Sequence, residues 1–132
     1  MTDRNLLEKA AEVMQNSYSP YSRIKTGAAI EYTDGTTFVG CNVENAAISS
    51  SMCAEAVAIS AAISSGKRDF KRIAIISESS SYSLPCGACR QLLNEFSPEV
   101  ELLCARADGR YVSYPLSALL PMPYGKEQTS NA

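Results

Sequence analysis

The stretch from residue 53 to residue 77 restricts the fold more than any other part of the chain. Residues 53–65 are rich in Ala and Ile and stop at Gly66, and glycine commonly ends a helix. Because this helix would be apolar almost all round, we expect it to be buried. Residues 73–77 then form a short apolar run, which is typical of a central strand covered on both faces. A buried helix that leads into a central strand predicts an α/β fold.

The segments on either side predict the remaining elements. Apolar residues at helical spacing behind Asp3 predict a capped, amphipathic helix over residues 3–17, which Pro20 brings to an end. Thr33-Asp34-Gly35 predicts a hairpin turn, because an Asp-Gly pair between two apolar runs favours this conformation. The other expected elements are strands at 24–33, 36–42, 99–105 and 111–114, a helix at 86–96 and a short helix at 116–120. Together they predict a three-layer α/β/α sandwich with a mixed five-stranded sheet, its last two strands antiparallel, in one domain over residues 1–132.

Charge and hydropathy argue against two classes of partner. The chain has 12 Lys and Arg against 14 Asp and Glu, a net charge of −2, and its only basic clusters are Lys67-Arg68 and Lys71-Arg72. Nucleic-acid-binding proteins normally present a basic face, so we expect no nucleic-acid partner. No apolar run approaches the roughly 20 residues that cross a bilayer, and residues 1–11 lack the pattern of a signal peptide. The expectation is a cytoplasmic protein without a membrane partner.

The chain has five cysteines and no histidine, and this combination limits its chemistry. Without an imidazole, serine triads, Cys–His dyads and histidine-containing zinc sites are all excluded. Cysteines in a cytoplasmic protein more often bind metal or carry out thiol chemistry than form disulfides. The sequence therefore directs attention to cysteine-only metal sites and to dithiols.

Three of the cysteines stand at the expected starts of two helices. In Pro85-Cys86-Gly87-Ala88-Cys89 the spacing places both sulfurs on one side of a first helical turn, where free N–H groups favour thiolate. Cys53 opens the other helix, and Glu55 follows two residues later. If the strands before these helices are parallel or adjacent, the three sulfurs meet and can bind zinc, with a fourth position left for water. Zinc lowers the pKa of such a water to about 7, and Glu55 could move its protons.

Other interpretations of these residues stay open at this point. The Pro85–Cys89 segment also resembles a thioredoxin-type redox motif, although a redox protein would leave Cys53 and Glu55 unexplained. Cys41 or Cys104 could complete a closed, four-cysteine structural zinc site, but both fall in apolar strands, where cysteine is usually a small core residue. Glu55 itself could be an ordinary first-turn acid that the helix dipole favours.

Taken together, C-A-E at residues 53–55 and P-C-G-A-C-R-Q at residues 85–91 resemble the zinc-dependent nucleoside deaminases, and more closely the short cytidine deaminases. The resemblance continues through residues 19–22, 26–29, 40–47 and 119–121. It implies a cytidine-deaminase-like fold. It also implies the hydrolytic deamination of cytidine or deoxycytidine to uridine or deoxyuridine and ammonia, a reaction of pyrimidine salvage.

The same resemblance assigns roles to individual residues. It implies one zinc ion per subunit, held by Cys53, Cys86 and Cys89, with Glu55 as the catalytic acid and base. It further implies a homotetramer in which neighbouring subunits share their sites. The substrate-binding residues that it implies are Asn42 and Glu44 at the sugar hydroxyls, the backbone of Ala54 at the pyrimidine, Ile24 in the base pocket and a neighbour's Tyr124 near the base.

Two positions depart from the family pattern. The family commonly has an arginine directly after the catalytic glutamate, where this chain has Ala56, and we expect Arg90 and the two helix N-termini to compensate for the lost positive charge. An aromatic residue of the base pocket is replaced by Ile24. C-A-E-A also resembles the blasticidin S deaminases, so a modified cytosine nucleoside is the alternative substrate. The sequence Asn-Val-Glu-Asn at residues 42–45 matches the ribose motif of the nucleoside enzymes and favours cytidine and deoxycytidine.

Overall fold

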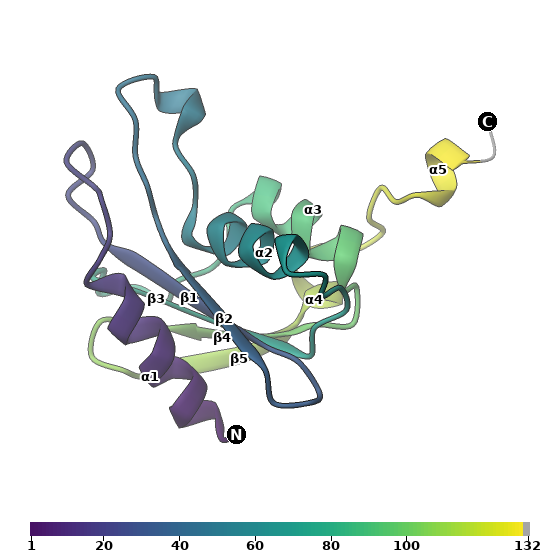
Figure 1. Cartoon of the computed structure of the whole chain (residues 1–132), viewed down its shortest axis with the longest axis horizontal. Coiled ribbons are helices and arrows are strands. Elements are labelled where there is room, and N and C mark those ends of the chain that lie inside the picture. Colours follow the sequence, from purple (N-terminus) through teal and green to yellow (C-terminus); the bar gives the residue numbers. More distant parts are fainter. Residues whose placement is uncertain (131–132) are drawn as a thin grey trace.

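A five-stranded sheet runs through the centre of the computed structural model, which describes residues 1–130 (Figure 1). The strands are β1 (Thr26–Glu31), β2 (Thr37–Cys41), β3 (Arg72–Ser77), β4 (Glu101–Ala105) and β5 (Tyr111–Pro115). Their order across the sheet is β2-β1-β3-β4-β5, and of these pairings β3–β4 alone is parallel. The predicted mixed sheet with antiparallel last strands is confirmed.

Strands β2 and β3 point in the same direction, because each runs antiparallel to β1, which lies between them. Their carboxyl ends therefore lie at the same edge of the sheet. A long loop leads from β2 into helix α2 (Ala54–Ser64), and a shorter one leads from β3 into helix α3 (Gly87–Phe96). Both helices consequently begin near one edge of the sheet.

Helices cover both faces of the sheet (Figure 1). Side chains alternate between the faces along each strand, so neighbouring residues of one strand join different cores. Helix α1 (Asp3–Met14) covers one face, where the core contains Leu6, Ala10, Ala29, Ala74, Ile76 and Leu103. Helices α2 and α3 cover the other face, where the core contains Ile59, Leu93, Ile30, Ile73, Ile75 and Leu102. The three predicted layers are confirmed.

The ends of α1 differ from the prediction. The hydroxyl of Thr2 accepts a hydrogen bond from a backbone N–H of the first turn, so Thr2 rather than Asp3 caps the helix. The helix ends at Met14, earlier than predicted, because the chain beyond it pairs elsewhere: Tyr18 forms a β-bridge with Val43. This bridge ties the segment before β1 to the loop after β2.

Three short helices complete the described chain. They are the 3-10 helix η1 (Ile48–Ser50) in the loop between β2 and α2, α4 (Leu116–Leu119) and α5 (Glu127–Ser130). The sequence predicted α4 but not the other two. The tail that carries α5 extends away from the sheet (Figure 1). None of the helices in the described part of the chain has the length and apolar character needed to cross a bilayer.

Candidate active site

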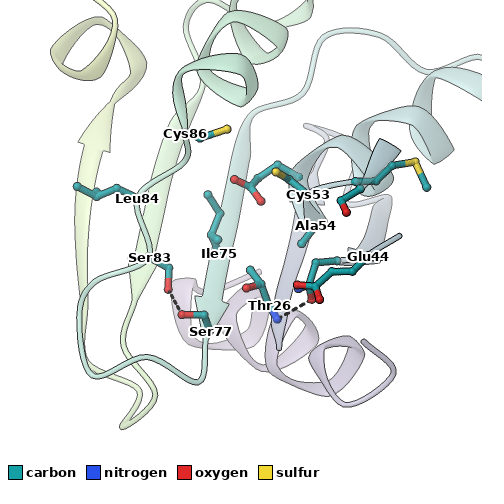
Figure 2. A pocket seen from close by; sticks show the side chains of 13 residues that line it. Thr26, Glu44, Cys53, Ala54, Ile75, Ser77, Ser83, Leu84 and Cys86 are labelled. Atoms are coloured by element: carbon teal, nitrogen blue, oxygen red, sulfur yellow. Dashed lines mark hydrogen bonds between the residues drawn. The ribbon is translucent and has the colours of Figure 1, made fainter. Parts of the chain in front are cut away.

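The two cysteine motifs meet where α2 and α3 begin. Cys53 immediately precedes the first turn of α2, and Cys86 holds the same position in α3. Both residues have an extended backbone, and neither side chain makes the hydrogen bond that a polar capping residue would make. Their thiols are therefore available for other contacts, and Figure 2 shows both sulfurs at the same end of one cavity.

Cys53, Cys86 and Cys89 place their sulfur atoms within 4.8 Å of one another. Zn–S bonds of about 2.3 Å in a tetrahedron separate the sulfurs by about 3.8 Å, so small side-chain movements bring all three to one ion. A cysteine-only donor set suits zinc, and three ligands leave one tetrahedral position open. Within residues 1–130 no further Cys, Asp or Glu joins this cluster, so Cys41 and Cys104 do not complete a four-cysteine site.

Contacts within the cluster shift the pKa values of Cys53 and Cys89 in opposite directions. A hydrogen bond with Cys89, opposed by burial and aided by a weaker hydrogen bond with Cys86, lowers the pKa of Cys53 to about 6. The pKa of Cys89 is raised, first by the same hydrogen bond and then by burial and the negative charge of Glu55. Because metal ligands must be deprotonated, a cluster that holds a thiolate near neutral pH is prepared to bind a divalent cation.

Glu55 lies in the first turn of α2 with only 5% of its surface exposed. Burial raises the pKa of its carboxyl to about 7; a hydrogen bond with its own backbone opposes this rise, and the charge of Cys53 adds to it. An acid that served only the helix dipole would be solvated, whereas this one is enclosed beside the cysteine cluster. A carboxyl that titrates near neutral pH is suited both to accept and to donate a proton.

A cavity of about 330 Å³ adjoins the cysteine cluster. Cys53, Glu55 and Cys86 are among its lining residues, and Glu44 lies on the side away from Cys86 (Figure 2). Among the predicted site residues, Asn42 and Ala54 also line this cavity. The sequence did not identify its other lining residues, which are Thr26, Ser51, Met52, Ile75, Ser77, Ser83 and Leu84.

Some of the lining residues that the sequence did not identify lie at positions where a general rule of sheet topology expects ligands to bind, and others do not. Thr26 and Ser77 are cross-strand partners at adjoining ends of β1 and β3. Ser77 ends a strand whose partner β4 is parallel, and ligands commonly bind beyond the carboxyl ends of such strands. That rule could have found Ser77. Isolated hydroxyl residues such as Ser83 carry no spacing pattern that points to a cavity.

Asn42 and Glu44 line the cavity and also hold the segment that leads into β1. Asn42 accepts a hydrogen bond from the Thr26 N–H at its Oδ1 (2.9 Å) and donates one from its Nδ2 to the Ile24 carbonyl (2.9 Å). Oε1 of Glu44 accepts hydrogen bonds from the two consecutive N–H groups at residues 21–22, each at 3.0 Å. A second N–H on Nδ2 of Asn42 and further lone pairs on Glu44 stay available for a ligand.

Comparison with known proteins agrees with this geometry. The family model described as the cytidine and deoxycytidylate deaminase zinc-binding region matches residues 1–104. The chain belongs to this family. A cytidine deaminase from Sporosarcina psychrophila is 35% identical over 133 aligned residues, which cover 100% of this chain and 98% of that protein. A crystal structure of cytidine deaminase from Burkholderia pseudomallei has a TM-score of 0.91 and 38% identity, covering 94% of this chain and 100% of that one.

The deaminase family also includes a relative with a different named substrate. A blasticidin-S deaminase from Bacillus cereus is 29% identical over 130 residues, which cover 92% of this chain and 91% of that protein. The resemblance of C-A-E-A at residues 53–56 to the blasticidin S deaminases is thus matched by a homologue with that name. The family description names zinc binding, and the cluster of Cys53, Cys86 and Cys89 has the geometry to hold such an ion.

Two residues that the resemblance assigned to substrate lie outside the cavity lining of the single chain. Ile24 is 46% exposed in the segment before β1, where its carbonyl accepts the hydrogen bond from Asn42. Tyr124 is 60% exposed on the C-terminal tail, where its carbonyl accepts a hydrogen bond from Nε2 of Gln91 at 2.7 Å. Their roles at the base stay predictions.

Proposed function

We propose that this protein is a zinc-dependent hydrolase that deaminates cytidine and deoxycytidine to uridine and deoxyuridine with release of ammonia. The observation that carries the proposal is the meeting of three cysteine sulfurs and the buried carboxyl of Glu55 at one cavity. Homologues of matching length named cytidine deaminase support it.

Glu55 is the proposed catalytic acid and base. Zinc held by Cys53, Cys86 and Cys89 would act as a Lewis acid and bring the pKa of a water bound to it close to 7. The Glu55 carboxyl takes a proton from the attacking water and delivers it to N3 of the pyrimidine. After attack at C4, the same carboxylate takes the second proton from the new hydroxyl group at C4 and passes it to the amino group. The C4–N bond then breaks, ammonia leaves and the C4 carbonyl forms.

The opposite part of the cavity is the proposed sugar site. The unused N–H of Asn42 would donate to a sugar hydroxyl, and the Glu44 carboxylate would accept from one. Ala54, buried in the first turn of α2, would present its backbone to the pyrimidine. We include Ile24 and a neighbour's Tyr124 as further proposed contacts of the base.

The charge of the cavity favours an uncharged nucleoside over a nucleotide. Hydrogen bonds from the hydroxyl and N–H of Ser22, with one from the Tyr21 N–H, hold the pKa of Glu44 below its usual range, so this carboxylate is ionised at neutral pH. The 13 lining residues include Glu44 and Glu55 but no Lys or Arg. A phosphate on the sugar would meet this negative charge without a compensating cation among the described lining residues.

We also propose that the enzyme is a homotetramer. Large apolar side chains are exposed in and beside the loop between β2 and α2, among them Ile48 at 79% and Met52 at 49%. Met52 also lines the cavity. Large exposed apolar side chains close together in the chain are consistent with a protein interface. Light scattering should give four times the mass of one chain, and a fully active monomer would contradict the proposal.

Ammonia release from a panel of substrates tests the reaction. The zinc-loaded protein is incubated with cytidine, deoxycytidine, 5-substituted cytidines, blasticidin S, cytosine and guanine. Cytidine and deoxycytidine should be converted, and removal of zinc by a chelator should stop the conversion. Turnover of blasticidin S alone would establish the alternative that the Bacillus cereus homologue supports. A protein that deaminates nothing but forms a reversible Cys86–Cys89 disulfide would instead be a redox protein.

A further inference from the structure

Arg90 joins the peptide before Cys86 to a helix that is distant in sequence. It lies near the start of α3 and directly follows Cys89. Its Nε donates a hydrogen bond to the carbonyl of Pro85 at 2.8 Å, and its Nη1 donates one to the carbonyl of Leu119 at 2.8 Å. Leu119 ends α4, where the last carbonyls of a helix lack partners within the helix.

We propose that Arg90 is a positioning residue of the metal centre, which holds the Pro85–Cys86 peptide so that the Cys86 sulfur stays beside the other two. The inference rests on the proposed zinc enzyme. Cys86 needs such support because it is exposed and lies outside the first turn of α3. The planar guanidinium reaches both carbonyls at once, which an ammonium group on a flexible chain does not reproduce.

The segment before Cys86 is anchored from its other side by Ser83. The Ser83 N–H and hydroxyl both donate to the Ala105 carbonyl in β4, at 3.1 Å and 2.7 Å. Between this anchor and α3, the Pro85 carbonyl is held by Arg90. The peptide that carries Cys86 is thus tied to the sheet on one side and to α4 on the other. Loss of Arg90 would remove the hydrogen bond to the Pro85 carbonyl, which lies nearer in the chain to Cys86 than the contact of Ser83 does.

Arg90 is also a cation close in sequence to the cysteine cluster. Three thiolates and one divalent zinc have a net charge of −1, and Ala56 provides no cation next to Glu55. Arg90 directly follows Cys89 in the chain, and its guanidinium lies on the carbonyls of Pro85 and Leu119. Charge and geometry can be separated, because lysine keeps the charge of Arg90 but lacks the planar group that contacts two carbonyls.

The zinc affinity of Arg90→Lys tests the proposal. In the full-length enzyme, competition with a chelator should give a zinc dissociation constant raised by about 10- to 100-fold, the usual effect of losing a group that supports a metal ligand. The KM for cytidine should change little, because the sugar site is untouched, while kcat falls.

Arg68→Lys is the matched control. Arg68 likewise donates to two backbone carbonyls, those of Ile63 at 3.1 Å and Lys67 at 2.9 Å, but at the far end of α2. Its substitution should leave the zinc dissociation constant unchanged. The comparison therefore distinguishes an effect on the metal centre from the general loss of an arginine-to-carbonyl contact.

Three results would overturn the role of Arg90. They are an unchanged zinc affinity in Arg90→Lys, an equal loss in Arg68→Lys, and failure of Arg90→Lys alone to fold, since Arg90 would then support the fold as a whole. The wild-type protein keeps the two proposals apart. A wild type that binds no zinc and releases no ammonia refutes the proposed enzyme, whereas normal behaviour in both wild type and Arg90→Lys refutes only the role of Arg90.

Discussion

The backbone of Gly40 lies directly against the backbone of Ala58. A Cβ atom at position 40 would fall 2.4 Å from the Ala58 nitrogen and 2.8 Å from the Ala54 carbonyl oxygen. Glycine therefore permits a close approach of α2 to β2 that a side chain would prevent. The start of α2 carries Glu55, and the end of β2 leads into Asn42. This contact sets the separation between the catalytic and sugar-binding parts of the proposed site.

Gly40→Ala should push α2 away from β2 and reduce kcat/KM in protein that is still folded. Overpacking of this kind destabilises a protein by about 1–3 kcal/mol. Gly27→Ala is the matched control, because a Cβ there would meet the Ala10 carbonyl oxygen of α1 at 2.0 Å, away from α2. Chemical denaturation and steady-state kinetics measure both effects. An equal loss of kcat/KM in the two variants would show that Gly40 serves the fold only.

Glu55→Gln should remove most of the activity while the fold and zinc content persist. The amide has nearly the same shape as the carboxyl but cannot carry the proton, and general acid–base catalysis contributes about 10²- to 10⁴-fold. Metal analysis, circular dichroism and kcat are measured on the same preparation. Residual kcat near the wild-type value would remove Glu55 from the proton-transfer role.

Cys89→Ala should lower the zinc content from one ion per chain to nearly none, because two thiolates and water bind zinc far more weakly than three. Cys104→Ala is the control, since that thiol is fully buried in β4 and burial raises its pKa to about 12. Zinc stoichiometry after dialysis is the measurement. Equal zinc loss from both variants would contradict the proposed set of ligands.

Cytidine 5′-monophosphate should be a much poorer substrate than cytidine. The ionised Glu44 carboxylate would repel the phosphate, so we expect kcat/KM to fall by roughly tenfold or more. The difference should shrink as salt is added, because ions screen the repulsion. Parallel assays of the two compounds at low and high salt provide the test. Equal kcat/KM values would show that the acidic cavity does not select against phosphate.

The sequence predicted the elements that carry the cysteines because each has a local signal. Gly66 has a φ of 94° just beyond α2, and Gly35 has a φ of 88° in the predicted hairpin; both angles favour glycine. Cys86 precedes α3 by a single position, as its motif indicated. Signals of this kind depend on a few adjacent residues and can therefore be recognised without a structure.

What the sequence did not predict depends on contacts between distant segments. No local pattern places β1 between β2 and β3, although this order makes β2 and β3 run in the same direction and brings the helix starts together. The early end of α1 follows from the bridge between Tyr18 and Val43. The hydrogen bonds from the N–H groups of residues 21–22 to Glu44 also join segments that are distant in sequence. The family motif at residues 42–45 indicated only a sugar-binding role for Glu44.

Cys53 stands before α2 and Cys86 before α3, with the whole of α2 and β3 between them in the chain. One ion shared by both would cross-link these segments, so folding and metal loading become thermodynamically linked. Each tenfold rise in free zinc above the dissociation constant should add about 1.4 kcal/mol to the free energy of unfolding. Calorimetry in zinc buffers should show the Tm rising with the logarithm of free zinc, whereas a constant Tm would refute the linkage. The heat tolerance of this protein would then follow the metal supply of its surroundings.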